Sequence, residues 1–68
     1  MPIKISLKAA RVNADLTIKE ASSKMGISNK TLISWEKGKT DPSAVQIAKL
    51  VSLYGIPFEA LILPKYST

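Results

Sequence analysis

The chain has 68 residues, a net charge of +5 and 46% apolar residues, and it contains neither cysteine nor histidine. This length suits one small globular domain. The absence of cysteine excludes disulfides and thiolate zinc sites, and the absence of histidine removes the commonest general base. An excess of positive charge is typical of proteins that bind polyanions. No apolar run reaches membrane-spanning length and no signal-peptide core is present, so we expect a cytoplasmic protein.

The first residues predict a short arm followed by a helix. Residues 1–5, with alternating Ile3 and Ile5, could form a brief strand or an arm, and a frayed terminus is the simpler expectation. Ser6 can cap a first helix over residues 7–13, because its hydroxyl can accept from an unpaired backbone N–H of the first turn. Asp15 follows where a helix often ends in the left-handed conformation, which Asp tolerates better than most residues.

Residues 17–37 predict two short helices joined by a tight turn. Thr17 and Glu20 have the spacing of a capping box, in which each side chain bonds to the backbone N–H of the other residue. Gly26 marks the end of this helix, where the backbone needs a positive φ. Ser28 can then cap the next helix. Two short helices with a glycine-containing turn are typical of the helix-turn-helix unit.

The second of these helices has two distinct faces. Leu32 and Trp35 lie three residues apart on an apolar face, so we expect Trp35 to be a core anchor and not a base-stacking aromatic. Gly38 ends the helix. The opposite face carries four polar or basic residues and one isoleucine: Asn29, Lys30, Ile33, Ser34 and Lys37. Such side chains can bond to base edges and phosphates or contact a thymine methyl, whereas the simpler interpretation is a solvated helix face.

The last third of the chain predicts two more helices. Ser43 can cap a fourth helix, whose apolar residues recur at helical spacing as far as Tyr54, and Gly55 ends it. Pro57 precedes a fifth short helix over residues 58–62, and residues 64–68 form a tail. We therefore expect an all-α fold, a compact bundle of five short helices in a single domain spanning residues 1–68, with no confident strand.

From about residue 7 to residue 62, the chain resembles the phage repressor/Cro-type helix-turn-helix family, the xenobiotic-response-element class of small regulators. The strongest match is LTIKEASSKMGISNKTLISWEKGKTDPS at residues 16–43, and WEKGK followed by Pro-Ser is more specific than a generic helix-turn-helix. The resemblance implies a lambda-repressor-like domain of five helices, with helices 2 and 3 as the helix-turn-helix. The third helix, residues 28–37 here, would enter the DNA major groove.

The resemblance also implies a role for individual residues. The positions that face bases in the family are Ser28, Asn29, Lys30, Ile33 and Ser34. The positions that usually meet phosphates are Thr17, Lys37, Lys39 and Thr40. Arg11 and Glu36 match a structural ion pair beneath the DNA-facing surface. The apolar C-terminal segment often carries the dimer contact, which points to Phe58, Leu61, Ile62 and Leu63.

Three positions depart from the family pattern. Ile18 stands where glutamine is usual, and it lacks a polar group to touch phosphate or to brace the reading helix as that glutamine often does. Ala21 stands where leucine is common, so the core there is looser or is filled by Trp35. Ser22 stands where alanine is usual, and the close helix crossing should tolerate it.

These observations favour a sequence-specific regulator of transcription that binds double-stranded DNA. We expect a Cro-like or short phage or mobile-element repressor, which binds a palindromic operator through the major groove as a dimer and self-associates weakly when free. When bound it would associate with the nucleoid. The alternative is a protein-interaction module, such as the antitoxin of a toxin–antitoxin pair, because the segment over residues 58–63 is apolar.

An enzyme is not expected. The five acidic residues are scattered, and the chain has no glycine-rich phosphate loop. We likewise expect no cofactor, no metal, no small-molecule ligand and no membrane partner.

Overall fold

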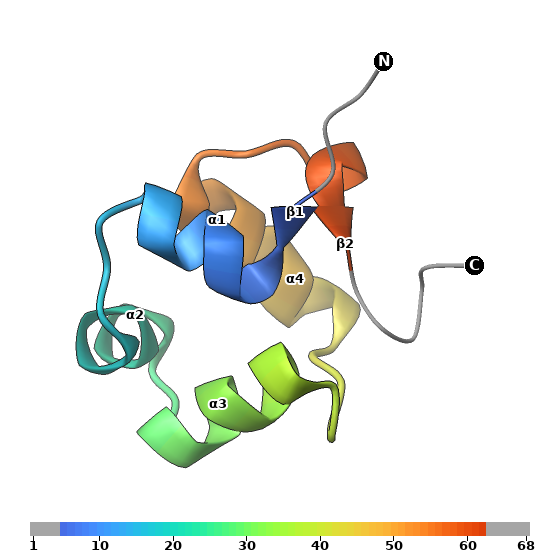
Figure 1. The fold of residues 1–68 in the computed structure, drawn as a ribbon. Coiled ribbons are helices and arrows are strands. Elements are labelled where there is room, and N and C mark those ends of the chain that lie inside the picture. Colours follow the sequence, from blue (N-terminus) through green and yellow to red (C-terminus); the bar gives the residue numbers. More distant parts are fainter. Residues whose placement is uncertain (1–4, 63–68) are drawn as a thin grey trace.

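The computed structural model describes residues 5–62, which form a small, mostly helical domain (Figure 1). Over this range, four α-helices and one 3-10 turn are accompanied by two very short strands. In chain order these are β1 (Ile5–Ser6), α1 (Leu7–Asn13), α2 (Ile18–Met25), α3 (Asn29–Lys37), α4 (Ala44–Tyr54), η1 (Phe58–Ala60) and β2 (Leu61–Ile62). The longest of these helices has 11 residues, and none is long and apolar enough to cross a membrane.

The expected fifth helix is wrong. Only the 3-10 turn η1 forms after Pro57, and the chain then becomes extended at Leu61. A helix of five residues could close very few internal hydrogen bonds, so it would be marginal by itself. The extended conformation instead buries Leu61, whose side chain is 8% exposed, and adds backbone pairing.

The two short strands also correct the expectation of an all-α fold with no confident strand. β1 and β2 pair in parallel, with Ile5 opposite Leu61 and Ser6 opposite Ile62. A parallel pair needs a long crossover connection, and here all the helices lie between the two strands. Residue 5 is therefore held against the end of the domain and is not frayed, while residues 1–4 of the expected arm and the expected tail over 64–68 lie outside the described residues.

The expected helix boundaries are confirmed because they depend on local side-chain caps. Each of the four α-helices begins at a hydroxyl that accepts from a backbone N–H of the first turn, and these hydroxyls belong to Ser6, Thr17, Ser28 and Ser43. At Thr17 the full capping box is present, with Glu20 bonding back to the backbone. Asp15 has a φ of 60°, so it does adopt the left-handed conformation between α1 and α2.

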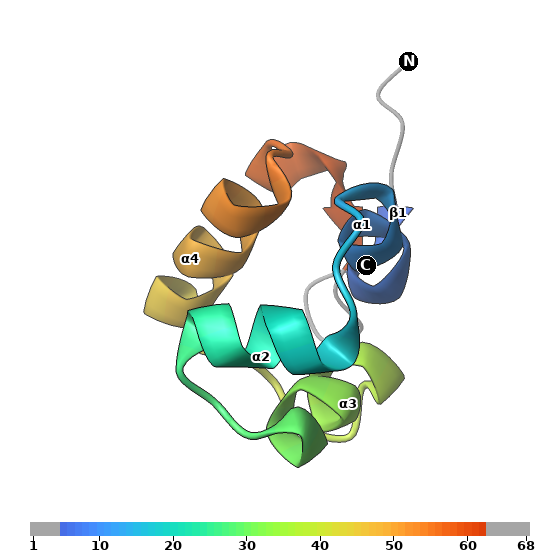
Figure 2. The ribbon, with the colours of Figure 1, turned by 90° about the vertical axis from the view of Figure 1, so that its left-hand side faces the viewer.

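The core lies where the four helices meet, and α3 contributes two of its members. Leu32 is fully buried and Trp35 is 4% exposed, so the expected core role of Trp35 is confirmed. The other core side chains come from the remaining elements: Leu7, Ala10, Ala21, Met25, Ile47, Leu50, Tyr54 and Leu61. Figure 2 shows the result, with α2 lying above α3, and with α4 and α1 above α2 at the left and the right. One face of α3 is therefore fixed to the core, and the opposite face points outward.

Candidate nucleic-acid interface

The turn between α2 and α3 sets the direction of α3. Gly26 has a φ of 72°, the left-handed conformation that residues with a Cβ rarely adopt. The backbone N–H of Ile27 then donates to the carbonyl of Ser22 over 3.0 Å, which closes the end of α2. This turn is followed directly by Ser28, the cap of α3. In Figure 1, α3 consequently forms the lower edge of the molecule.

The first turn of α3 holds three of the expected base-facing residues, and all three are exposed. The Ser28 hydroxyl is occupied within the helix, because it accepts from the Thr31 N–H over 3.1 Å and lies 2.9 Å from the Thr31 hydroxyl. The Asn29 side-chain oxygen accepts from the hydroxyl of Ser22 on α2. Lys30 is exposed and makes no hydrogen bond or ion pair with residues 5–62, so its amino group is available to a ligand.

The second turn of α3 presents one apolar and one polar side chain. Ile33 is 37% exposed, which is unusual for an isoleucine on an otherwise polar face. The hydroxyl of Ser34 lies 2.9 Å from the hydroxyl of Thr40, in the loop after α3. An exposed aliphatic side chain beside polar ones can contact a thymine methyl in the major groove.

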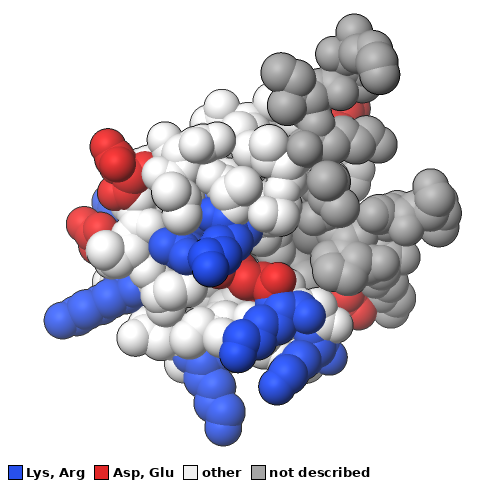
Figure 3. All heavy atoms as spheres, viewed as in Figure 1, with Lys and Arg blue, Asp and Glu red and all other residues white. Residues whose placement is uncertain are grey.

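The expected phosphate-contacting residues lie on two elements, at the start of α2 and at the end of α3 with its following loop. Thr17 caps α2, and its hydroxyl is engaged with the Glu20 N–H over 3.1 Å. Lys37 and Lys39 are both exposed at the end of α3 and in the following loop, where Thr40 also lies. Figure 3 shows lysine and arginine side chains projecting along the lower edge of the molecule, where α3 lies in Figure 1. With exposed Lys30 in its first turn and exposed Lys37 in its last, α3 is cationic at both ends.

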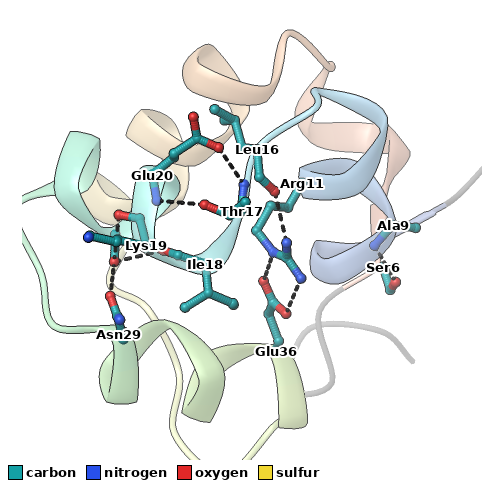
Figure 4. A network of polar contacts seen from close by, with 11 residues as sticks. Ser6, Ala9, Arg11, Leu16, Thr17, Ile18, Lys19, Glu20, Asn29 and Glu36 are labelled. Atoms are coloured by element: carbon teal, nitrogen blue, oxygen red, sulfur yellow. Dashed lines mark hydrogen bonds and ion pairs between the residues drawn. The ribbon is translucent and has the colours of Figure 1, made fainter.

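The structural ion pair that the resemblance implies is formed. Arg11 Nε lies 2.8 Å from a Glu36 carboxylate oxygen, and the two side chains are only 10% and 7% exposed. A second guanidinium N–H lies 3.4 Å from the other carboxylate oxygen, and a third donates to the carbonyl of Leu16 over 2.8 Å (Figure 4). The hydrogen bond to Glu36 raises the pKa of Arg11, so the guanidinium stays charged. The pair ties α1 and the α1–α2 connection to the last turn of α3.

Sequence reasoning missed three polar features around this surface. Two of them are the contacts of Ser22 with Asn29 and of Ser34 with Thr40. The sequence suggested a role for each of these residues but not that they contact each other. Buried Tyr54 has a hydroxyl that finds no hydrogen-bond partner within residues 5–62. Burial and the Glu36 carboxylate raise the pKa of Tyr54 to about 12. Its position at the end of the apolar repeat of α4 predicts burial, but no local pattern indicates an unpaired hydroxyl.

The expected dimer residues are divided between the core and the surface. Leu61 packs in the core of its own chain, whereas Phe58 is 53% exposed. Phe58 lines an apolar hollow of about 390 Å³ with Ala44, Ile47, Ala48 and Val51. The side chain of Ile62 and all of Leu63 lie outside the described residues. No group of three or more acidic residues that could hold a metal ion occurs among residues 5–62.

Known proteins resemble the chain across the same elements. A sequence profile of the helix-turn-helix family matches residues 7–61. The uncharacterized HTH-type transcriptional regulator MJ0272 of Methanocaldococcus jannaschii is 34% identical over 61 residues, which cover 90% of this chain and 92% of that protein. No solved structure gives a match to the chain.

Two bacterial relatives are longer than this chain. The transcriptional repressor RstR of the cryptic phage CTXphi, from Vibrio cholerae, is 30% identical over 56 residues, which cover 82% of this chain and 50% of RstR. The HTH-type transcriptional regulator ImmR of Bacillus subtilis is 38% identical over 56 residues, which cover 82% of this chain and 44% of ImmR. With the profile extending from α1 to β2 and a phage repressor among these relatives, the chain belongs to the phage-repressor type of the helix-turn-helix family.

Proposed function

We propose that this chain is a sequence-specific regulator of transcription that binds double-stranded DNA and reads the major groove with α3. The observation that carries the proposal is the fixed outward face of α3. Leu32 and Trp35 hold the helix to the core, while Lys30 and Ile33 extend from it. On a helix fixed in this way, a lysine can donate to base acceptors in the major groove, and an isoleucine can contact a thymine methyl.

The names of the relatives favour repression as the mode of action. MJ0272 and ImmR are named as transcriptional regulators and RstR as a phage transcriptional repressor. The proposed mechanism is occupancy of an operator, in the manner of a Cro-like or short mobile-element repressor. Because this chain spans about half of RstR and less of ImmR, only the DNA-reading part of their activity is carried over.

The proposed division of labour on DNA follows the position and chemistry of each side chain. Lys37 and Lys39 contact phosphates at the far end of the surface and fix the register of the protein on the duplex. Thr17 and Thr40 contact phosphates through hydroxyls that already have a protein partner, since a hydroxyl oxygen can take part in more than one hydrogen bond. Lys30 and Asn29 read base edges near the N-terminus of α3, together with Ser28, Ser34 and the methyl groups of Ile33.

We also propose that two copies bind a palindromic operator with two-fold symmetry. Phe58 and the apolar hollow beside it are the part of the expected dimer surface that is exposed in one chain. Leu61 supports this surface from the core, and we propose that Ile62 and Leu63 also contribute to the dimer contact. A contact of this size is weak, so dimerisation would be completed on DNA.

Selection of bound sites from a pool of random duplexes tests this function. The wild-type chain should enrich a palindrome with half-sites about one helical turn apart. The double variant Asn29→Ala/Lys30→Ala should lose that enrichment, whereas Lys49→Ala should retain it, because Lys49 is an exposed lysine of α4 with the same charge. Failure of the wild-type chain to enrich any sequence would contradict the proposal.

The second candidate is a protein-interaction module, such as an antitoxin, and the apolar hollow beside Phe58 is the observation that favours it. The two functions differ in their salt dependence. Binding to DNA weakens steeply with salt, because counterions are released from phosphates. Docking of an apolar partner on the hollow would depend little on salt, and Phe58→Asp would abolish it without changing the contacts of α3.

A further inference from the structure

The hydroxyl of Ser22 is almost completely buried between α2 and α3. Ser22 is 1% exposed, although a hydroxyl in an apolar core is costly unless it is hydrogen-bonded. Its oxygen lies 2.7 Å from the carbonyl of Ile18 and 3.2 Å from that of Lys19, both on its own helix. It also contacts the side-chain oxygen of Asn29, at the start of α3. In Figure 4, Asn29 points toward the first turn of α2, where Ile18 and Lys19 are labelled.

The single proton of this hydroxyl determines which of the three contacts is a hydrogen bond. The backbone carbonyls of Ile18 and Lys19 already accept from the helix N–H groups four residues later. They therefore remain hydrogen-bonded even when the Ser22 hydroxyl donates elsewhere. The Asn29 oxygen carries no proton, and two bare oxygens in contact would repel each other. Donation from Ser22 to Asn29 therefore satisfies the buried hydroxyl and joins the two helices.

We propose that Ser22 is a positioning residue for DNA reading, which holds the Asn29 amide with its oxygen turned inward and its NH₂ group turned toward the groove. The inference rests on the proposed function of α3. The contact of Ser22 with Asn29 would also brace α3, which Ile18 cannot do because it has no polar group.

The orientation of the amide has a consequence for specificity. A bidentate contact to adenine needs both the oxygen and the nitrogen of asparagine at the base edge. An oxygen held by a hydroxyl that is 1% exposed is directed away from the groove, so Asn29 is left with N–H donors only. Asn29 should therefore contact the acceptors of its base pair, such as N7 and O6 of guanine or O4 of thymine, and not the amino groups of adenine or cytosine.

The first arm of the test uses the free protein. The ¹⁵N relaxation of the Asn29 side-chain NH₂ group should report a rigid amide in the wild type and a flexible one in Ser22→Ala, with an order parameter below about 0.6. Ser23→Ala is the matched control, since it makes the same change at the next, exposed residue of α2. Alanine is a good helix former and is smaller than serine, so both variants should fold. Equal mobility of the Asn29 amide in Ser22→Ala and wild type would overturn the proposal.

The second arm uses DNA and a panel of single-base changes in the selected duplex. Ser22→Ala should reduce the preference at one base pair of each half-site about fivefold, the equivalent of roughly 1 kcal/mol of coupling. Ser22→Ala should have no further effect in the Asn29→Ala background, and Ser23→Ala should change nothing. A uniform loss on all duplexes, or a loss that persists without Asn29, would assign Ser22 a purely structural role. A contact that is lost when a base analogue removes the amino group of adenine N6 or cytosine N4, and not when one removes the acceptor, would show the amide turned the other way and would also overturn the proposal.

The two arms separate this inference from the proposed function. A chain that prefers no duplex would contradict the proposed function and, with it, the reading role of Asn29. The relaxation measurement would still decide whether Ser22 holds the amide, because it needs no DNA.

Discussion

Loss of the Glu36 carboxylate should destabilise the fold far more than loss of an ordinary surface charge. The Arg11 guanidinium bonds to Glu36 and to the carbonyl of Leu16, and its side chain is 10% exposed. Glu36→Gln keeps the size and one oxygen acceptor of the side chain but leaves the guanidinium without its counter-charge. An uncompensated buried charge is costly, because neither water nor a partner then stabilises it.

The magnitude follows from the burial of the pair. Breaking a buried ion pair by removing one partner costs about 3–5 kcal/mol. Because Gln retains one acceptor, we expect Glu36→Gln to lower the free energy of unfolding by about 2–3 kcal/mol. A chain of 68 residues has a total stability of roughly 3–10 kcal/mol, so this is a large share of it. Arg11→Met should cost as much, since it leaves the Glu36 carboxylate unpaired.

Urea unfolding followed by far-UV circular dichroism and by Trp35 fluorescence measures these effects. The double variant Arg11→Met/Glu36→Leu is the informative control, because replacing both charges with apolar side chains is often neutral or stabilising. We expect it to lie within about 1 kcal/mol of the wild type. The reasoning would be refuted if the single variants had the same urea midpoint as the wild type. It would also be refuted if the double variant lost as much unfolding free energy as the two single variants together.

The other predictions concern the core, the DNA surface and pH. Trp35→Ala should cost about 3–5 kcal/mol and leave the chain largely unfolded at 37 °C, and a cooperative melt within a few degrees of the wild type would contradict the core role of Trp35. Lys30→Ala should cost about 1–3 kcal/mol of binding and relax the preference at one base pair, whereas Lys39→Ala should weaken all duplexes alike. A dimer that contacts about four phosphates per protomer should give a log–log salt slope near −7, which Lys39→Ala makes shallower by about one unit per protomer. The folded pKa of Tyr54 is about 12, above its usual value of 10.0, so the buried neutral phenol stabilises the fold fully below pH 10. This stabilisation should be lost as the pH rises from 10 to 12. In thermal melts over this range, Tyr54→Phe should show a smaller loss of stability than the wild type.

The sequence allowed the helices and their order to be predicted because their boundaries depend on neighbouring residues. Serine or threonine caps and the left-handed residues Asp15 and Gly26 act within a few positions, so their effects are visible in the sequence. The pairing of β1 with β2 was missed because it joins Ile5 to Leu61 across the whole chain. Two-residue strands have no period of their own, and tertiary packing decided between a helix and an extended segment at Leu61.

The candidate site was predictable residue by residue but not in its internal contacts. The face of α3 follows from helical spacing, which places Leu32 and Trp35 on the side opposite Lys30. The contact of Ser22 with Asn29 depends on how closely two helices cross, and each residue also fits a simpler local role. Spacing alone therefore identifies which side chains face outward but not which of them are already engaged with the protein.

The specificity ratio tests the central claim, that the outer face of α3 reads DNA sequence, most directly. It is the affinity of the chain for its selected duplex divided by its affinity for a scrambled duplex of the same composition at the same salt concentration. Specific binding predicts a ratio of at least about 1,000 for the wild type and for Lys49→Ala. Asn29→Ala/Lys30→Ala should lower the ratio by at least about tenfold. A wild-type ratio near one, or a ratio that this double change leaves intact, would contradict the claim.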